Sequence, residues 1–369
     1  VIVIQDSTSL VQTVATPTNL GTGTYTVERE GADDHGVYNY WSSPVQNTII
    51  DSVFGSAGRK FYTFDSESQA WSGANTSTVL DAGLGFIATG TSGTATTIVR
   101  TFSDNTGFNS GDISQSLYYS GASHADSNWH LIGNPYPSGL DVNAFLTDNA
   151  SEIESSVYLW SSDGSDYNST QSDYAIMGLA GSVNAGGSGT TPTSATISSA
   201  QGFFVQSKAS GSVQFSNSQR VSTNNTFQRT SSSEMERIWL GVEKENGAKN
   251  EILLAFLDEA EEGKDLYDAS KLSGNAFVSL YSIGDCKGVA CNAKYAIQSL
   301  PSLTTERNIP IGIEAKEAGE FTFSINHLDN LDELTEVYLY DLETEELIDL
   351  RNGDYKVHLE KGEFNERFE

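Results

Sequence analysis

The sequence predicts an all-β protein, in which a duplicated β-sandwich-like N-terminal domain precedes a second, antiparallel β-sandwich with a jelly-roll-like arrangement. Short runs of residues alternate apolar and polar side chains, as a strand with one buried face requires. Glycine is abundant, with 34 residues in 369, and turns rich in Ser and Thr separate the runs. Helix-favouring stretches of Ala, Leu, Lys and Glu are rare before about residue 235.

The chain is strongly acidic, with 49 Asp and Glu against 20 Lys and Arg and a formal net charge of -29. Binding a phosphate backbone needs clustered Lys and Arg, and the sequence has no such cluster, so we expect no nucleic-acid partner. No apolar run approaches the roughly 20 residues that span a bilayer, so we expect no direct membrane insertion. Plain solubility explains the charge, and loose binding of cations is the alternative.

Composition divides the chain near residue 232. Residues 1–20 alternate in polarity and are predicted to be the end of an upstream β-repeat region or a linker. Residues 21–229, rich in Ser, Thr and Gly, form the predicted duplicated domain. Glu, Asp, Lys and Leu become frequent afterwards, so residues 236–369 are predicted to form the C-terminal β-sandwich.

The first domain contains two similar units, at about residues 21–115 and 116–229. Each has an aromatic strand, a turn with Pro, a second aromatic strand and a Gly-Phe pair that opens a third strand. The landmarks are Tyr38–Trp41, Pro44, Phe61–Phe64 and Gly85–Phe86 in one unit, and Trp129–Leu131, Pro135, Val157–Trp160 and Gly202–Phe203 in the other. Such a repeat predicts two similar β units packed together, in which Gly85 and Gly202 let the backbone approach a neighbour closely.

The C-terminal region carries about eight strand signals separated by turns, the spacing expected of a two-sheet sandwich. They lie at residues 238–242, 251–257, 276–281, 295–300, 308–313, 319–325, 336–341 and 354–359. Helix is predicted only as short turns, at 141–148 with Asp141 as the N-cap and at 265–272.

Several motifs, taken in order, resemble a known family. Residues 40–45 (YWSSPV), 129–137 (WHLIGNPYP), 200–205 (AQGFFV), 213–220 (VQFSNSQR) and 237–242 (RIWLGV) resemble large secreted proteins of Bacteroidota that are exported by type IX secretion. Each motif is short, and the specific feature is their order along almost the whole chain.

This resemblance implies an adhesin-like cell-surface protein and a place just before its C-terminal sorting domain. The segments at 337–342, 353–357 and 362–368 look like the stretch that precedes that sorting domain. The implied partner is the type IX secretion machinery, reached through a sorting domain that this chain lacks. The implied location is secreted or on the outer-membrane cell surface.

Motifs for catalysis are missing from the sequence, and we expect no enzymatic activity. The five His residues are scattered without metal-ligand spacing, and no nucleophile elbow or phosphate-binding loop is present. The many Asp and Glu side chains allow a pair of glycosidase-type acids, but solvated surface carboxylates are the simpler interpretation.

Two loops have the oxygen-rich composition that calcium prefers. The candidate ligands are Asp163, Asp166 and Asn168 in one loop, and Asp104, Asn109 and Asp112 in the other. Neither loop has the spacing of an EF-hand. The alternative is that these side chains close hairpins as Asx turns. Calcium is the only cofactor that the sequence suggests.

Three aromatic residues beside polar loops are candidates for stacking on sugars, namely Trp71, Trp160 and Tyr167. The alternative is that they pack between the sheets.

The only two cysteines, Cys286 and Cys291, are predicted to form a disulfide across a short loop, as suits an oxidising extracellular place. Free thiols are the alternative, and a Cys pair without further ligands makes a poor zinc site.

The sequence therefore predicts a non-catalytic adhesin module for display and attachment, with surface glycans as the expected ligand class. Two alternatives remain open. One is a carbohydrate-binding accessory region of a secreted glycan-degrading enzyme, which aromatic side chains on one exposed sheet face would favour. The other is a passive spacer before the sorting domain.

Overall fold

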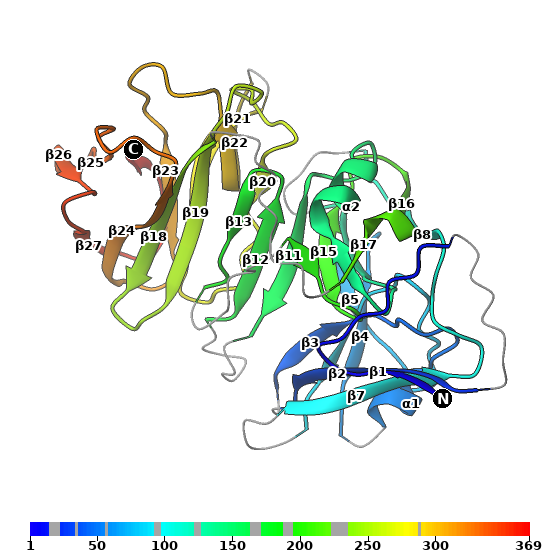
Figure 1. Cartoon of the computed structure of the whole chain (residues 1–369). Coiled ribbons are helices and arrows are strands. Elements are labelled where there is room, and N and C mark those ends of the chain that lie inside the picture. Colours follow the sequence, from blue (N-terminus) through cyan, green and yellow to red (C-terminus); the bar gives the residue numbers. More distant parts are fainter. Residues whose placement is uncertain are drawn as a thin grey trace. The chain divides into compact units, whose positions relative to one another are not determined.

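The structure, a computed structural model, describes residues 1–14, 23–33, 36–55, 58–91, 97–121, 127–162, 171–186, 195–222, 235–286 and 289–369. Nearly all its regular elements are strands, which confirms the predicted all-β, sandwich-like fold (Figure 1). The chain divides into two compact units, residues 1–160 with 193–228 and residues 161–192 with 229–369. Residues 161–192, which composition places in the first domain, thus belong to the second unit.

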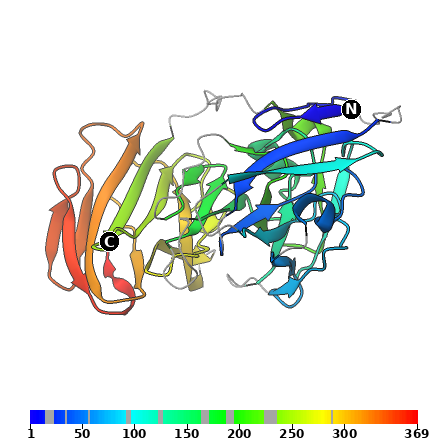
Figure 2. The same cartoon turned by 90° about the horizontal axis from the view of Figure 1, so that it is seen from below.

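The first unit contains a small sandwich with an aromatic core. One sheet has the order β1 (Ile2–Ile4), β2 (Tyr25–Ala32) and β7 (Thr97–Asp104), with β1 parallel to β2, and β2 and β7 form a long pair (Figure 2). The other has the order β3 (Tyr38–Trp41), β6 (Phe86–Thr89), β4 (Phe61–Asp65) and β5 (Ala70–Gly73). Buried Val27 and Phe102 from the first sheet pack with Trp41 and Phe86 from the second, and Phe54 of α1 (Ile50–Phe54) completes this core.

The rest of the first unit is built around a second antiparallel sheet. Its order is β9 (Trp129–Gly133), β15 (Gly202–Gln206) and β11 (Ser156–Ser161). Smaller elements are β10 (Gly139–Asp141), β14 (Thr196–Ile197), β17 (Arg220–Val221), β8 (Ile113–Leu117), β16 (Gly211–Phe215) and the 3-10 turn η1 (Asn217–Gln219). The predicted helical turn is confirmed as α2 (Val142–Asp148), where the Asp141 carboxylate accepts from Ala144 N at 2.9 Å.

In the first unit, the sheet that contains β3, β6 and β4 and the sheet that contains β9, β15 and β11 share an order of elements. In one, β3 pairs with β6 and β6 with β4, and α1 lies between β3 and β4 in sequence. In the other, β9 pairs with β15 and β15 with β11, and α2 lies between β9 and β11. The shared order favours the predicted duplication.

Glycines bring the sheet of β3, β6 and β4 into backbone contact with the sheet of β9, β15 and β11. A Cβ atom on Gly85 would lie 2.5 Å from Ile132 O, and one on Gly202 would lie 2.9 Å from Trp41 O. Gly85 N donates to Leu131 O at 3.2 Å, and Gly133 N donates to Gly83 O at 3.0 Å. The expectation that Gly85 and Gly202 permit a close approach is therefore confirmed.

The second unit is dominated by one eleven-stranded sheet that curls around a single core. Its order is β26 (Glu346–Asp349), β25 (Tyr338–Asp341), β28 (Gly362–Phe368), β23 (Ile311–Ala315), β21 (Val278–Cys286), β22 (Val289–Leu300), β19 (Lys249–Phe256), β18 (Glu236–Lys244), β24 (Gly319–Asp329) and β27 (Tyr355–Leu359), with β20 (Ala269–Ser270) also paired to β22. Among the described residues, every pair in it is antiparallel except β19 with β22. Inward-facing residues such as Leu240, Leu280, Ile313 and Phe323 fill the core. A hairpin of β12 (Asp173–Gly178) and β13 (Gly181–Val183) also belongs to this unit.

The helical turn predicted at 265–272 is wrong. The Asp265 carboxylate accepts from Tyr267 N at 2.7 Å, and the Asp268 carboxylate accepts from Asp265 N at 2.8 Å and Ser299 N at 2.7 Å. These bonds give the backbone an alternative to helix, and β20 follows directly. Burial of the Asp268 carboxyl raises its pKa to about 7, although the two backbone N–H groups oppose the shift.

We expect Gly85→Ala to destabilise the first unit by about 1–3 kcal/mol, because the added methyl group meets backbone that cannot move aside. The control is Gly73→Ala on β5, where a Cβ atom meets nothing within 4 Å and the change should stay within about 0.5 kcal/mol. Urea unfolding followed by tryptophan fluorescence measures both. Equal losses in the two variants would contradict the close approach.

We expect the Asp268 carboxyl to make the second unit less stable as the pH rises from about 4 to about 7. In that window the folded state keeps a proton that the unfolded state has lost, so stability is highest at the acidic end. Asp268→Asn stays neutral throughout. Its unfolding free energy relative to wild type should therefore rise by about 2–4 kcal/mol between pH 4.5 and pH 8 in urea titrations. A constant difference across this range would refute the raised pKa.

Candidate functional site

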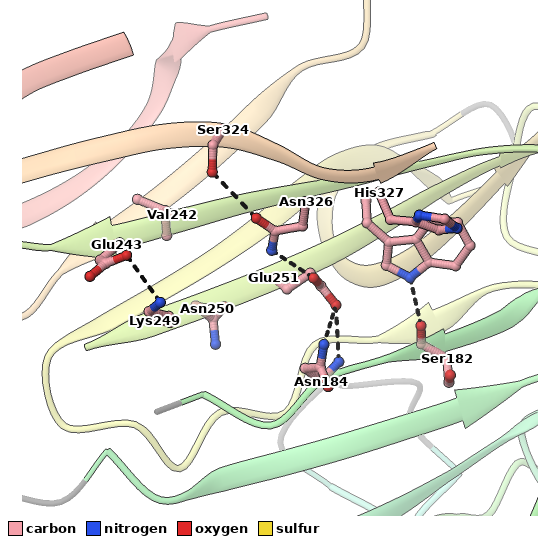
Figure 3. A pocket seen from close by; sticks show the side chains of 11 residues that line it. Ser182, Asn184, Val242, Glu243, Lys249, Asn250, Glu251, Ser324, Asn326 and His327 are labelled. Atoms are coloured by element: carbon pink, nitrogen blue, oxygen red, sulfur yellow. Dashed lines mark hydrogen bonds and ion pairs between the residues drawn. The ribbon is translucent and has the colours of Figure 1, made fainter. Parts of the chain in front are cut away.

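A pocket of about 560 Å³ lies in the second unit, on the face of β18, β19 and β24 that points away from the core (Figure 3). Leu240 and Ile252 face the core, so the alternate residues of the same strands face outward. The segment 182–184, at and just after the end of β13, forms one side. The lining residues are Ser182, Asn184, Trp239, Val242, Glu243, Lys249, Asn250, Glu251, Ser324, Asn326 and His327.

Glu251 on β19 organises the polar part of the pocket. Its side chain is buried, and its Oε1 accepts from Asn184 N at 3.1 Å and from Asn184 Nδ2 at 3.2 Å. Its Oε2 accepts from Asn326 Nδ2 at 2.7 Å, and Ser324 Oγ donates to Asn326 Oδ1 at 3.3 Å (Figure 3). The carboxylate thus fixes two amide side chains from different elements.

A glycine and a bulge allow this arrangement. Gly241 on β18 is paired with Glu251 on one side and with Ser324 on the other. A Cβ atom on Gly241 would lie 2.4 Å from Asn326 Nδ2, so the Asn326 amide crosses the space that a side chain would fill. Trp239 pairs with His327 whereas Leu240 pairs with Ile325, which makes Asn326 the extra residue of a β-bulge. Bulges re-aim side chains in this way.

An aromatic platform stands beside the polar groups. Trp239 is half-buried, and its ring nitrogen donates to Ser182 O at 2.8 Å, which fixes the ring edge against β13. The exposed His327 ring lies 5.1 Å from the Trp239 ring, at an interplanar angle of 49°. The Trp239 ring is therefore held in place before any ligand arrives.

This combination suits a ligand with an apolar face and several hydroxyl groups. The Trp239 ring offers an apolar surface, and the Asn and Glu side chains offer fixed donors and acceptors. Asn184 Oδ1 is buried and has no hydrogen-bond partner among the described residues. A hydroxyl group of a ligand could donate a hydrogen bond to this oxygen. Pyranose rings have both features.

The structure brings together two of the three predicted stacking residues, in the first unit. Trp160 stacks on Tyr40 with ring centroids 5.9 Å apart, and Trp71 meets the same Tyr40 edge-on at 6.0 Å. Trp71 also packs on buried Phe204 and remains 41% exposed. These contacts favour the alternative that the two tryptophans pack between sheets, and stacking of either one on a sugar stays a prediction. Tyr167 lies outside the described residues.

One of the two predicted calcium loops lies within the described part. Asp104 Oδ1 accepts from Thr106 N at 2.6 Å and from the Thr106 hydroxyl, while Asn109 is buried and donates to Ser43 O at 2.8 Å. Asp112 is exposed. These contacts close the turn. Among the described residues, no three His, Cys, Asp or Glu side chains lie close enough together to hold a metal ion. Asp163, Asp166 and Asn168 lie outside the described residues.

The two cysteines lie on one hairpin. Cys286 is the last residue of β21, and Cys291 lies in β22. The backbone register is irregular here and pairs Cys286 with Val289. Both side chains lie outside the described part, so the disulfide stays a prediction.

The pocket residues did not stand out in the sequence. The run from Ile238 to Val242 was recognised as a strand, but nothing in it shows which partner strand lies opposite Trp239. A usable signal is the charged Glu251 at the start of an otherwise apolar strand. A buried carboxylate needs hydrogen-bond partners, so a Glu in such a strand indicates a polar contact with another segment.

A family model described as a domain of unknown function, DUF8693, matches residues 1–369. The chain belongs to this family. Comparisons with curated proteins and with solved structures gave no match. Within the described ranges, the helices are too short or too polar to cross a membrane.

We expect Glu251→Ala to lower the unfolding free energy of the second unit by about 1–3 kcal/mol, because three N–H groups then lose their acceptor. The control is Glu243→Ala, which removes an exposed carboxylate 3.1 Å from Lys249 and should change stability by less than about 0.5 kcal/mol. Urea titrations of the two variants provide the comparison. If Glu251→Ala is as mild as the control, the carboxylate does not organise the pocket.

Proposed function

We propose that the chain is a non-catalytic attachment module of a secreted or cell-surface protein, and that it binds a saccharide in the Trp239 pocket. The observation that supports this is the fixed Trp239 ring beside the Glu251, Asn184 and Asn326 side chains. Ring stacking supplies affinity, and the amide and carboxylate groups select the arrangement of hydroxyl groups.

The charge of the site favours a neutral saccharide over an acidic one. The described partners of the Glu251 carboxylate are amide N–H groups, and Glu243 stands at the rim beside Lys249. The chain as a whole carries a net charge of -29. Uronic or sialic acids would meet repulsion from both sources.

The wider setting of the proposal comes from the resemblance to type IX secretion cargo. Export through that machinery by a C-terminal sorting domain, an adhesin-like role and a cell-surface location all remain part of the proposal. A carbohydrate-binding accessory region of a secreted enzyme would use the same pocket. Calcium, if it binds, would act through the loops that carry Asp104 or Asp163.

A glycan array tests the proposal, run on the purified chain with calcium and with a chelator. We expect wild type to bind neutral glycans, and we expect Trp239→Ala to bind them at least about tenfold more weakly because the stacking surface is gone. The matched control is Trp71→Ala, which removes the exposed tryptophan of the first unit and should keep wild-type binding. Circular dichroism checks that both variants are folded.

Each other outcome contradicts part of the proposal. Absence of binding by wild type favours a passive spacer. Binding that Trp71→Ala abolishes and Trp239→Ala retains moves the site to the aromatic cluster of the first unit. Binding that disappears with chelator assigns the ligand contact to a calcium loop.

A further inference from the structure

A second polar cluster in the second unit adjoins the Trp239 pocket through Asn250, and the inference drawn from it does not depend on saccharide binding. It consists of Asp173, the first residue of β12, Asn250 on β19 and Lys271, which directly follows β20. Asp173 and Asn250 are only 1% and 3% exposed, and the Lys271 side chain is half-buried. Burial of polar and charged side chains costs free energy, so a cluster of a carboxyl, an amide and an amine at this position requires a physical explanation.

The three side chains form a chain of short contacts. Lys271 Nζ lies 2.7 Å from Asn250 Oδ1, and Asn250 Nδ2 lies 2.8 Å from Asp173 Oδ2. Leu280 N also donates to Asn250 Oδ1 at 2.8 Å, which fixes the amide orientation because a backbone N–H must face an oxygen. Asp173 Oδ1 accepts from Gly274 N at 2.6 Å and from Tyr174 N at 2.9 Å.

We propose that Lys271 and Asn250 join in an intramolecular isopeptide bond, with Asp173 as the catalytic acid and base. The amine lies at the carbonyl end of the Asn250 amide, and the carboxyl lies at its nitrogen end. This places an attacking nucleophile and a proton donor for the leaving group on one amide. The Leu280 N–H stands where negative charge develops on the oxygen.

The reaction balances without any further reactant. The neutral Lys271 amine attacks Cγ of Asn250, and the C–N bond to Nδ2 breaks. Asp173 gives its proton to the leaving nitrogen and takes one from the attacking nitrogen, so it ends as it began. The products are a Lys–Asn amide and one molecule of ammonia.

The electrostatic setting supports the required protonation states. Burial raises the pKa of the Asp173 carboxyl, although Lys271, Lys316 and two backbone N–H groups oppose that shift. Burial lowers the pKa of the Lys271 amine to about 8, opposed by Asp173 and Glu251 and assisted by Lys316. Both shifts favour the neutral amine and the neutral acid over the charged pair.

The bond would close a covalent loop across the sheet. Residues 251–270, which include most of β19 and all of β20, lie between the two linked positions. Restricting the unfolded chain in this way raises the melting temperature, by roughly 5–10 °C for a loop and a unit of this size.

Intact mass spectrometry of the purified wild-type chain tests the proposal directly. We expect a mass about 17 Da below that of the sequence, which corresponds to one ammonia. Tandem spectra of a protease digest should contain a branched species in which the peptide with Lys271 is joined to the peptide with Asn250. A wild-type mass without the ammonia loss overturns the proposal and leaves the cluster as a hydrogen-bonded network.

The position of the ammonia loss in the sequence distinguishes the isopeptide bond from a reaction of an asparagine with its own main chain. Asn246-Gly247 and Asn352-Gly353 are sites where an asparagine side chain is itself attacked by the chain and also releases ammonia. An ammonia loss located at either pair, with an unmodified Lys271 peptide, overturns the proposal as well.

Variants of the reacting residues test whether the ammonia loss depends on those side chains. Lys271→Met and Asp173→Asn should both have the full sequence mass, and the melting temperature of Lys271→Met should fall. The control Lys264→Met removes a lysine whose Nζ contacts Ser270 Oγ at 3.4 Å and should retain the ammonia loss. Retention of the loss in Lys271→Met would refute the assignment, and the wild-type mass remains decisive if a variant does not fold.

Discussion

Backbone contact at glycine is the constraint on which the first unit depends. Two sheets with the same element order meet where Gly85 and Gly202 leave no side chain between the main chains, and Gly85 and Gly133 also donate hydrogen bonds across the contact. Because main-chain atoms cannot shift as side chains do, the contact fixes where each sheet begins. The residues that directly follow Gly85 and Gly202, namely Phe86 and Phe203, are fully buried.

In the second unit, a glycine leaves space for a side chain and not for a second main chain. Gly241 leaves a gap in the outer face of β18, and the bulge at Asn326 turns an amide into that gap. The buried Glu251 then holds the amide in place. A small change in strand register thus converts a plain sheet surface into a pocket with fixed polar groups. The proposed saccharide site and the proposed isopeptide bond use neighbouring residues of β19, Glu251 and Asn250, and Asn250 also lines the pocket.

Sequence was sufficient where local chemistry decides the structure. The all-β class, the α2 turn with its Asp141 cap and the close approach at Gly85 and Gly202 follow from alternation, capping and glycine placement. It was insufficient where distant segments meet. Residues 161–192 join the second unit through tertiary contacts that composition does not record, and the partners of Glu251 come from residues 67 and 75 positions away. The error at 265–272 arose because Asp side chains bind the backbone as readily in a turn as at a helix cap.

The place of β28 has a mechanical consequence. This strand lies inside the sheet, between β23 and β25, with Tyr340 and Glu369 bonded to one another by both main-chain groups. Tension applied along the strand through residue 369 would load the ladders on both sides in shear. Hydrogen bonds loaded in shear must yield together, whereas an edge strand peels away one bond at a time. Pulled along its own axis, β28 should therefore yield only at a higher force than an edge strand of the same length.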